Sequence, residues 1–534
     1  MTGHLELWVL GLLAAVAGLV MLSNRLGVPY PVLLVLGGLA LGLVPVVPMI
    51  ELPPDLILLI FLPPLLYSAA FFSSPRDLKA NLRPIASLSV GLVGLTTVTV
   101  AVAAHLLVDL PWASAFVLGA IVSPTDPVAA TAVVGRLRAP RQIVTILEGE
   151  SLINDGTALV LYSVAVSAAV TGSFSLPDAA LEFVLYGVGG TAIGLVVGWA
   201  ISRVRRWIAD PLVEITVTLF TPYAAYIPAE ELGVSGVLAA VAAGLYLGWR
   251  NPETTAPRNR LQAFGLWEVL PFLLNSVLFI LIGLQLPNIL ESISGEYPVT
   301  SVVLYAAVVS LAVIGTRLLW TFPATYLPRY LSRSVRERNP SPPWQQIAAI
   351  AYTGMRGAIS LAAALAIPIT VENGAPFPGR DQILFLSFCV ILITLVVQGL
   401  SLPLLVRRLG LAGAEGEEER EETEARLRAA EAALARLEEL EDEEWVREDT
   451  TARMRDLYEY RRRRFAARQD ERPEGGEAGD GYEERSLAYQ RFRRELLGAE
   501  RAALLRLRGE GRISDEVRRR VERDLDLEDA RLEI

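Results

Sequence analysis

Thirteen long apolar stretches, separated by short polar loops, make up the first three quarters of the chain. Each is about as long as a helix needs to cross the roughly 30 Å hydrocarbon core of a bilayer. The pattern therefore predicts an all-α membrane protein with about thirteen transmembrane helices. The predicted spans are residues 5–22, 30–47, 56–72, 85–108, 113–135, 143–170, 180–201, 212–228, 233–249, 265–286, 298–327, 346–368 and 382–406.

Basic residues in the loops alternate between the two sides of the predicted bundle. Every second loop is basic, with 19 Lys and Arg residues in total, whereas the opposite side holds Arg380 alone. Because Lys and Arg are retained on the cytoplasmic side of a membrane, we expect the N-terminus outside and the C-terminus in the cytoplasm. The chain is thus predicted to be a multi-pass protein of a plasma membrane.

Charge divides the chain into two regions. Residues 412–534 hold 36 acidic and 26 basic residues, whereas residues 1–411 hold 22 of each, so the net charge of −10 belongs to the C-terminal region alone. We predict a transmembrane domain over 1–411 and a charged cytoplasmic helical tail over 412–534. The apolar region excludes a long soluble enzyme, and the lone Cys389 excludes a disulfide framework.

The tail has a helical composition rich in Ala, Glu, Arg and Leu. One helical stretch is expected from Glu415 to about Asp470, a break at 473–476 (PEGG), and a second stretch from about Glu484. These helices could coil across a dimer, and the basic patch 461–464 could touch anionic lipid. The alternative is a solvated charged face without a specific partner, and regulation by the tail is a hypothesis.

Six charged residues fall inside the predicted spans and away from their ends. A charge at the centre of a bilayer costs roughly 2.5–3.5 kcal/mol, so each must be paired, protonated or in contact with water. Intramembrane charges are therefore the first candidates for function. The six are Asp126, Glu148, Glu150, Asp155, Arg317 and Arg356.

Span 113–135 contains the sequence SPTDP at 123–127. Each proline removes a backbone donor and disfavours the α conformation of the preceding residue, so Ser123 and Asp126 are expected to be extended and the helix to be interrupted. The carbonyls of Ala120 and Ser123 are then expected to be free to coordinate a small cation beside the Asp126 carboxylate. The simpler alternative is a proline kink with a hydrogen-bonded acid.

Span 143–170 contains the sequence EGESLINDGT at 148–157. Spacings of three and four residues are expected to place four polar side chains on one helical face: Glu150, Ser151, Asn154 and Asp155. At about 1.5 Å per residue, Asp155 and Asp126 reach the same depth from opposite sides. Such oxygen ligands suit a hard cation, and desolvation favours a protonated carboxyl, so cation and proton can compete for one site. The alternative is a polar cluster that only holds helices together.

Span 346–368 contains TGMRG at 353–357, in which glycines flank Arg356. This pattern predicts a second interrupted helix, whose cation could neutralise nearby helix C-terminal dipoles. The span lies seven spans after 113–135, and an odd shift inverts the direction of the chain. Spans 1–6 and 8–13 are therefore expected to form an inverted repeat, with two interrupted helices that cross at the midplane.

Arg317 lies inside span 298–327 and is expected to pair with an acid of span 143–170. We prefer Glu150 to Glu148 because Glu150 lies deeper and nearer the site. The pair is expected to be structural, since breaking it would leave an unpaired buried charge.

Five stretches of sequence together resemble the monovalent cation:proton antiporter family, specifically the bacterial sodium/proton exchangers with an Asn-Asp motif. The stretches are FLPPLLYSAAF (61–71), SPTDPVAATAV (123–133), EGESLINDGTALVL (148–161), LFILIGLQLP (278–287) and TGMRGAISLAAALA (353–366). They occur in family order over nearly all of 1–411. Many relatives have an acid on the third span, where this chain has Tyr67-Ser68.

The resemblance implies a homodimeric antiporter of a bacterial plasma membrane that exchanges one Na+ for one H+ by an elevator-like cycle and serves pH homeostasis. Electroneutral exchange is implied because Asn154 stands where the electrogenic branch has a second acid. The resemblance makes Arg317 the partner of Glu150. The residues that it implies for Na+ and H+ are Asp155, Asp126 and Thr125, with Ser151 and Asn154 in support.

Two rival functions stay open at this point. A K+ or Li+/H+ antiporter would use the same residues, whereas a cation channel with a regulatory tail would use filter loops repeated around a symmetry axis. The chain has no Walker loop, no Rossmann fingerprint beside a strand and no metal-ligand Cys/His spacing. We therefore expect a transporter driven by an ion gradient, embedded in membrane lipid, that is not an enzyme, needs no cofactor and binds no nucleic acid.

Overall fold

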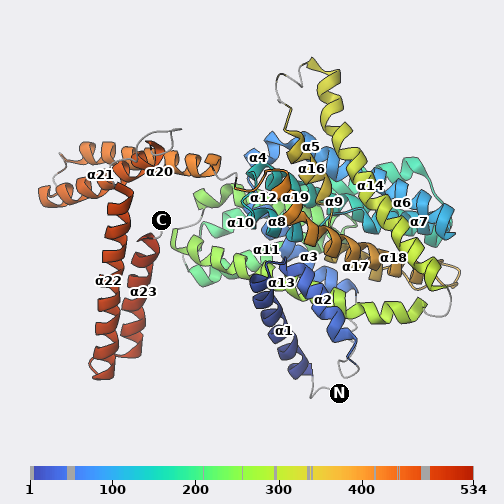
Figure 1. The fold of residues 1–534 in the computed structure, drawn as a ribbon, viewed down its shortest axis with the longest axis horizontal. Coiled ribbons are helices and arrows are strands. Elements are labelled where there is room, and N and C mark those ends of the chain that lie inside the picture. The colour runs from blue at the N-terminus through green and yellow to red at the C-terminus, as the bar shows by residue number, and fades with distance from the viewer. Residues whose placement is uncertain are drawn as a thin grey trace. The chain divides into compact units, whose positions relative to one another are not determined.

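The structure, a computed structural model, consists of two compact units, Met1–Ala414 (unit 1) and Glu415–Ile534 (unit 2). It describes residues 5–44, 54–208, 210–254, 257–293, 298–333, 337, 341–413, 416–441, 443, 445–470 and 482–532. Helices account for nearly all of these ranges, and the β pairing within them is a single bridge between Thr370 and Pro376 (Figure 1). The prediction of an all-α fold is therefore confirmed.

Thirteen helical segments in the described part of unit 1 overlap the thirteen predicted spans one for one, with the short α4 (Pro75–Ala80) between the third and fourth. By length and composition, eight described segments can cross a membrane, and three shorter apolar helices accompany them. The segments are α1 (Leu5–Leu26), α2 (Tyr30–Gly42), α3 (Pro54–Phe72), α5–η2–α6 (Leu82–Ala86, Ser87–Leu92, Val93–Val108), α7 and α8 (Trp112–Val122, Pro127–Arg136), α9 (Arg141–Thr171), α10 (Leu176–Arg205), α11 (Pro211–Glu231), α12 (Gly236–Thr254), α13 (Pro257–Ile293), α14 (Val299–Leu331), α16 and α17 (Trp344–Tyr352, Ala358–Leu365), and α18–η3–α19 (Arg380–Ile393, Thr394–Gln398, Gly399–Arg408).

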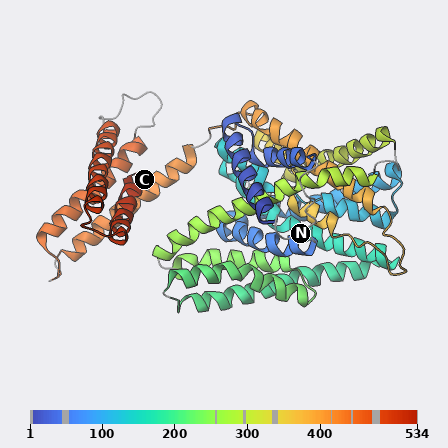
Figure 2. The same cartoon turned by 90° about the horizontal axis from the view of Figure 1, so that it is seen from below.

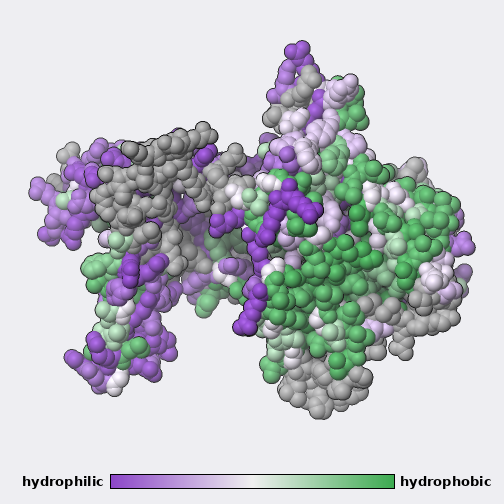
Figure 3. Space-filling view, in the orientation of Figure 1, coloured by the Kyte–Doolittle hydropathy of each residue, from purple (hydrophilic) through white to green (hydrophobic). Residues whose placement is uncertain are grey.

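Small residues let the helices of unit 1 approach closely. Gly38 of α2 and Gly283 of α13 face each other so tightly that a Cβ on either would collide with the opposite backbone. Such small-residue contacts are typical of helices packed in a membrane. Figure 2 shows α10, α11 and α12 side by side along one flank, and these three helices pack against one another. The face of unit 1 seen in Figure 3 is broadly apolar, as a lipid-facing surface requires.

Both predicted interruptions are present, between α7 and α8 and between α16 and α17. Asp126 is extended, as expected, and caps α8 by accepting a hydrogen bond from Val128 N–H at 2.9 Å. The prediction for Ser123 is wrong, because Ser123 stays helical and its hydroxyl donates to the Ala120 carbonyl at 2.9 Å. This serine therefore replaces the backbone donor that Pro124 lacks, and the Ala120 carbonyl is not free for a cation.

The described residues of unit 2 form four helices, α20 (Gly416–Leu440), α21 (Glu448–Asp470), α22 (Tyr482–Gly509) and α23 (Asp515–Leu532). The single helix expected from Glu415 to Asp470 is wrong, since α20 and α21 are two helices packed together. The chain folds back because this buries Ala430 and Phe465, which one straight helix would leave exposed. The predicted break at 473–476 lies outside the described residues.

Candidate functional site

A cavity of about 320 Å³ lies between α3, α8, α9, α13 and α17. Asp126 and Asp155, which the sequence predicts at the same depth, both line it. Its hydroxyl, amide and carboxyl residues are Ser68, Thr125, Asp126, Thr131, Glu148, Ser151, Asp155, Asn275 and Ser360. The cavity thus collects oxygen ligands from the first interrupted helix and from α9 in one place.

Asp155 is the buried acid of this cavity. Its side chain belongs to a residue that is 3% exposed, and the charges that act on it are those of two other acids, Asp126 and Glu150. Across the described ranges, no side chain or backbone group donates a hydrogen bond to it and no base pairs with it. A bare carboxylate in such surroundings is strongly disfavoured. Among the described residues, an ionised Asp155 therefore has no counter-charge.

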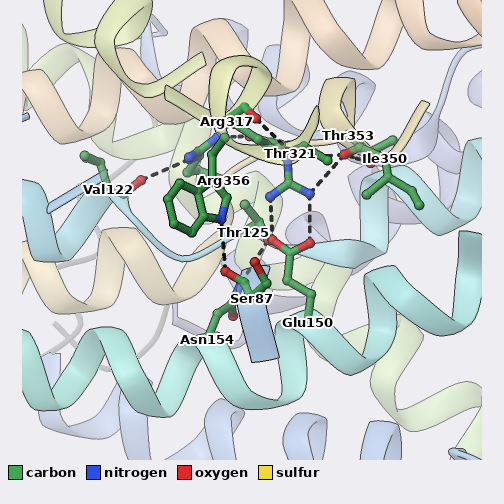
Figure 4. Close-up of polar contacts among 12 residues, drawn as sticks. Ser87, Val122, Thr125, Glu150, Asn154, Arg317, Thr321, Ile350, Thr353 and Arg356 are labelled. Atoms are coloured by element: carbon green, nitrogen blue, oxygen red, sulfur yellow. Dashed lines mark hydrogen bonds and ion pairs between the residues drawn. The ribbon is translucent and has the colours of Figure 1, made fainter. Parts of the chain in front are cut away.

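Glu150, on the same helix, is neutralised by Arg317 of α14 (Figure 4). Arg317 Nη2 donates to Glu150 Oε2 at 2.8 Å and Nη1 donates to Oε1, a bidentate contact between residues that are each 1% exposed. The guanidinium also donates to the Ile350 carbonyl near the end of α16 at 3.1 Å. These are the two residues for which the sequence predicts an ion pair, and the contact links α9, α14 and α16.

Thr125 connects this ion pair to the Asn-Asp motif. Its hydroxyl donates to Glu150 Oε1 at 2.9 Å and accepts from Asn154 Nδ2 at 2.9 Å (Figure 4). The four polar residues of α9 therefore meet two different neighbours. Ser151 and Asp155 line the cavity, whereas Glu150 and Asn154 contact Thr125, because neighbouring helical residues point about 100° apart.

The two interruptions contact each other directly. The Asp126 N–H donates to the Met355 carbonyl at 2.8 Å. Arg356 Nε donates to the Val122 carbonyl, at the last residue of α7, at 3.0 Å (Figure 4), and its backbone N–H donates to Thr394 Oγ1 at 3.1 Å. A buried cation therefore lies at the negative end of the α7 dipole, where helix carbonyls lack partners.

Sequence reasoning left out several residues of the site. The sequence favours Glu150 over Glu148 as the partner of Arg317 and gives Glu148 no role, yet Glu148 lines the cavity, and so do Ser68, Asn275 and Ser360. An uncharged polar residue inside an apolar span, such as Asn275, is the signal that a search limited to charges overlooks. Ser68 shows that α3 contributes a hydroxyl to the lining.

A second buried polar cluster lies away from the cavity, at the ends of α10 to α13. Arg205 donates to Glu214 Oε1 at 2.8 Å and to Asn251 Oδ1 at 3.1 Å, and Asn259 donates to the other Glu214 oxygen. The sequence predicts Arg205 in a loop because it belongs to a run of loop arginines. Its burial follows from three neighbouring helix ends that close around it, which no local pattern reveals.

Comparison with known proteins identifies relatives of this chain. A sequence model described as the transmembrane sodium/hydrogen exchanger matches residues 11–408. A Mycobacterium tuberculosis protein named as a Na+/H+ exchanger is 41% identical over 404 residues, which cover 75% of this chain and 73% of that protein. A Bacillus subtilis protein named as a sodium, potassium, lithium and rubidium/H+ antiporter is 34% identical over 389 residues, covering 71% and 58%.

The solved structures include a similar fold. The sodium proton antiporter of Methanocaldococcus jannaschii at pH 8 aligns with a TM-score of 0.59 at 21% identity. The alignment covers 76% of this chain and 99% of that chain. At this identity the likeness concerns the fold alone, and it agrees with the helical membrane architecture of unit 1.

Proposed function

Because this chain belongs to the transmembrane sodium/hydrogen exchanger family, we propose that it exchanges Na+ for H+ across a bacterial plasma membrane by secondary active antiport. The observation that carries the proposal is the state of Asp155. This carboxyl is buried, has no partner in the described parts of the chain and faces a cavity lined by oxygen ligands. Because the Asp155 carboxylate must bind either Na+ or H+, this one group is sufficient to couple the transport of the two ions.

The coupling follows from the cost of an empty charged site. A carboxylate without a bound ion would bring a bare charge into the membrane interior when the site changes sides. The Na+-loaded and H+-loaded forms of Asp155 are both neutral, so they cross readily. Ser151 and Thr125 supply hydroxyl oxygens near Asp126 and Asp155 for the dehydrated Na+.

The neighbouring charges favour an exchange of one Na+ for one H+. Glu150 and Arg317 neutralise each other, and Asn154 adds no charge. Asp126 is stabilised as an anion at the N-terminus of α8, where it accepts the Val128 N–H. Asp155 is then the one group that changes its load, which makes the cycle electroneutral.

The resemblance to the family supports the remaining features of the proposal. We place the N-terminus outside and the C-terminus in the cytoplasm because basic residues follow that pattern. The transport unit is residues 1–411, working as a homodimer with an elevator-like motion of the two crossed helices, in the service of pH homeostasis. Residues 412–534 form the cytoplasmic tail.

The alternative is an antiporter of broader or different selectivity. The Bacillus subtilis relative is named for sodium, potassium, lithium and rubidium, so K+ and Li+ are the competing substrates. A cation channel is the more distant rival. An unpaired acid that needs a load at each crossing favours exchange over continuous conduction.

Everted membrane vesicles test the proposal. Respiration acidifies the vesicle interior, and addition of Na+ should dissipate the ΔpH in vesicles that contain this chain. Asp155→Asn should abolish the response, whereas exposed Asp178→Asn, matched in chemistry, should retain it. A full response from Asp155→Asn would overturn the assignment, and a Na+ current without proton movement would favour the channel. Parallel additions of K+ and Li+ rank the three cations.

A further inference from the structure

The cavity contains an acid that the proposed exchange step does not use. Glu148, Ser151 and Asp155 all line the cavity and lie at positions i, i+3 and i+7 of α9. They therefore form a row along one helical face, with about 10 Å of helix between Glu148 and Asp155. A cation bound to one end of this row is too far from the other end to be shared, because hard cations bind oxygen at roughly 2–3 Å.

The row runs from a more exposed region to the buried site. Arg141, at the start of α9, has a side chain that is 54% exposed, Glu148 is half-buried and Asp155 is 3% exposed. Phe72, which lines the same cavity at the end of α3, is 50% exposed. Glu148 thus lies between the exposed start of α9 and the buried Asp155, on the side that the basic loops assign to the cytoplasm.

The cavity carries charge of one sign. Its charged residues are Asp126, Glu148 and Asp155, and its described lining contains no Lys, Arg or His. Arg141, the base that acts on Glu148, donates to Asp77 at 3.1 Å on the surface. Glu150, the other glutamate of the motif, is neutralised by Arg317 instead. A cleft lined by one sign of charge concentrates counter-ions, and unpartnered Asp155 at its buried end requires one.

We propose that Glu148 forms an outer cation-binding site, at which a monovalent cation is captured before it moves along Ser151 to Asp155. This inference rests on the proposed antiport and adds a second, weaker site on the same path. The two glutamates of the motif then have separate roles: Glu150 holds α9 to α14, and Glu148 raises the local concentration of the transported cation.

Transport kinetics of the full-length protein in liposomes test the outer site, with Na+ as the probe. In Glu148→Gln, KM for Na+ at low ionic strength should rise about threefold to tenfold, with kcat within about twofold of the parent. Glu148→Asp should behave like the parent, because it keeps the charge. Glu268→Gln removes an exposed acid on α13 outside the cavity and should leave KM unchanged.

Ionic strength gives an independent check on the same two proteins. An inert salt such as choline chloride should raise KM of the parent and bring it close to that of Glu148→Gln, because screening removes the electrostatic contribution. A KM for Glu148→Gln within about twofold of the parent at low ionic strength overturns the outer site, and so does a fall in kcat at constant KM.

A binding readout separates this inference from the proposed function. The Na+ concentration that half-maximally raises the melting midpoint of the purified protein should increase in Glu148→Gln, since ligand binding stabilises the folded state. If this concentration increases in Glu148→Gln while the parent moves no protons, the outer site stands and the antiport proposal fails. If the concentration is unchanged in Glu148→Gln while the parent exchanges Na+ for H+, the antiport proposal stands and the outer site fails.

Discussion

The Asp126 carboxylate lies directly against Gly357, although the two residues belong to different interrupted helices. A Cβ built on Gly357 would overlap with Asp126 Oδ2, so this close approach requires a glycine. The backbone at Gly357 has a negative φ, which other residues can adopt. Space alone therefore makes this glycine necessary, and the second interruption shapes the site contributed by the first.

Gly357→Ala should impair the cation site without a general loss of folding. The added methyl group would push Asp126 out of the cavity, so we expect KM for Na+ to rise by about tenfold or more. The Na+-induced dissipation of ΔpH in everted vesicles measures this. Gly94→Ala is the control, because a Cβ there meets no neighbour within 4 Å. Equal kinetics for the two variants would contradict the role given to Gly357.

Breaking the Glu150–Arg317 pair should mainly reduce stability. Glu150→Gln leaves Arg317 buried without a counter-charge, which costs roughly 3–5 kcal/mol of unfolding free energy. Denaturant titration in detergent should show this loss, and adding Arg317→Met to the variant should recover part of it. Glu231→Gln, an exposed acid, is the control. A double variant less stable than Glu150→Gln would show that Arg317 acts mainly through its bond to the Ile350 carbonyl.

The sequence predicts most of the fold because local features of the chain determine where membrane helices form and where they are interrupted. Length and hydropathy locate the thirteen segments, and prolines or glycines mark both interruptions. Ser123 shows the limit of such rules, because the preference of a residue before proline is small enough for one side-chain hydrogen bond to outweigh it.

The site is predicted less completely, because contacts between distant segments decide it. The motif around Asp155 indicates the chemistry, but a helical wheel does not show which half of a polar face meets Thr125 and which meets the cavity. Glu148 illustrates this: its sequence position is compatible with an ion pair, and only the placement of Arg317 beside Glu150 leaves Glu148 to the cavity.

Thr125→Val should lower both stability and exchange. The substitution keeps the shape of the side chain but removes the hydroxyl that joins Glu150 to Asn154. An Asn154 amide left unpaired in the interior costs about 1–3 kcal/mol. Thr125→Ser keeps the hydroxyl and should retain most of the activity. Indistinguishable melting midpoints for the parent and Thr125→Val would mean that the Thr125 hydroxyl does not contribute to stability.

Arg356→Gln should destabilise the crossing of the two interrupted helices. It removes the cation at the C-terminal end of α7, an interaction worth up to about 2 kcal/mol in a partly buried setting. Arg356→Lys keeps the charge but loses the forked geometry that serves the Val122 and Gly354 carbonyls together. We expect unfolding free energies in the order parent, Lys, Gln. If the Lys variant is as unstable as the Gln variant, Arg356 stabilises the protein through the geometry of its hydrogen bonds and not through its charge.

Removal of residues 415–534 should leave Na+/H+ exchange intact. Every residue proposed to bind Na+ or H+ belongs to unit 1, and unit 2 forms its own compact set of helices with its own ion pairs, such as Arg501–Asp526. Truncation should therefore keep KM and the maximal rate within about twofold of the parent, measured in proteoliposomes. A large rise in KM would show that the tail supports the cation site.

The pH profile of the truncated protein decides the regulatory hypothesis for the tail. A shifted profile sustains it, because a segment that supplies none of the proposed site residues would act by biasing the transport unit, and superimposable profiles remove it.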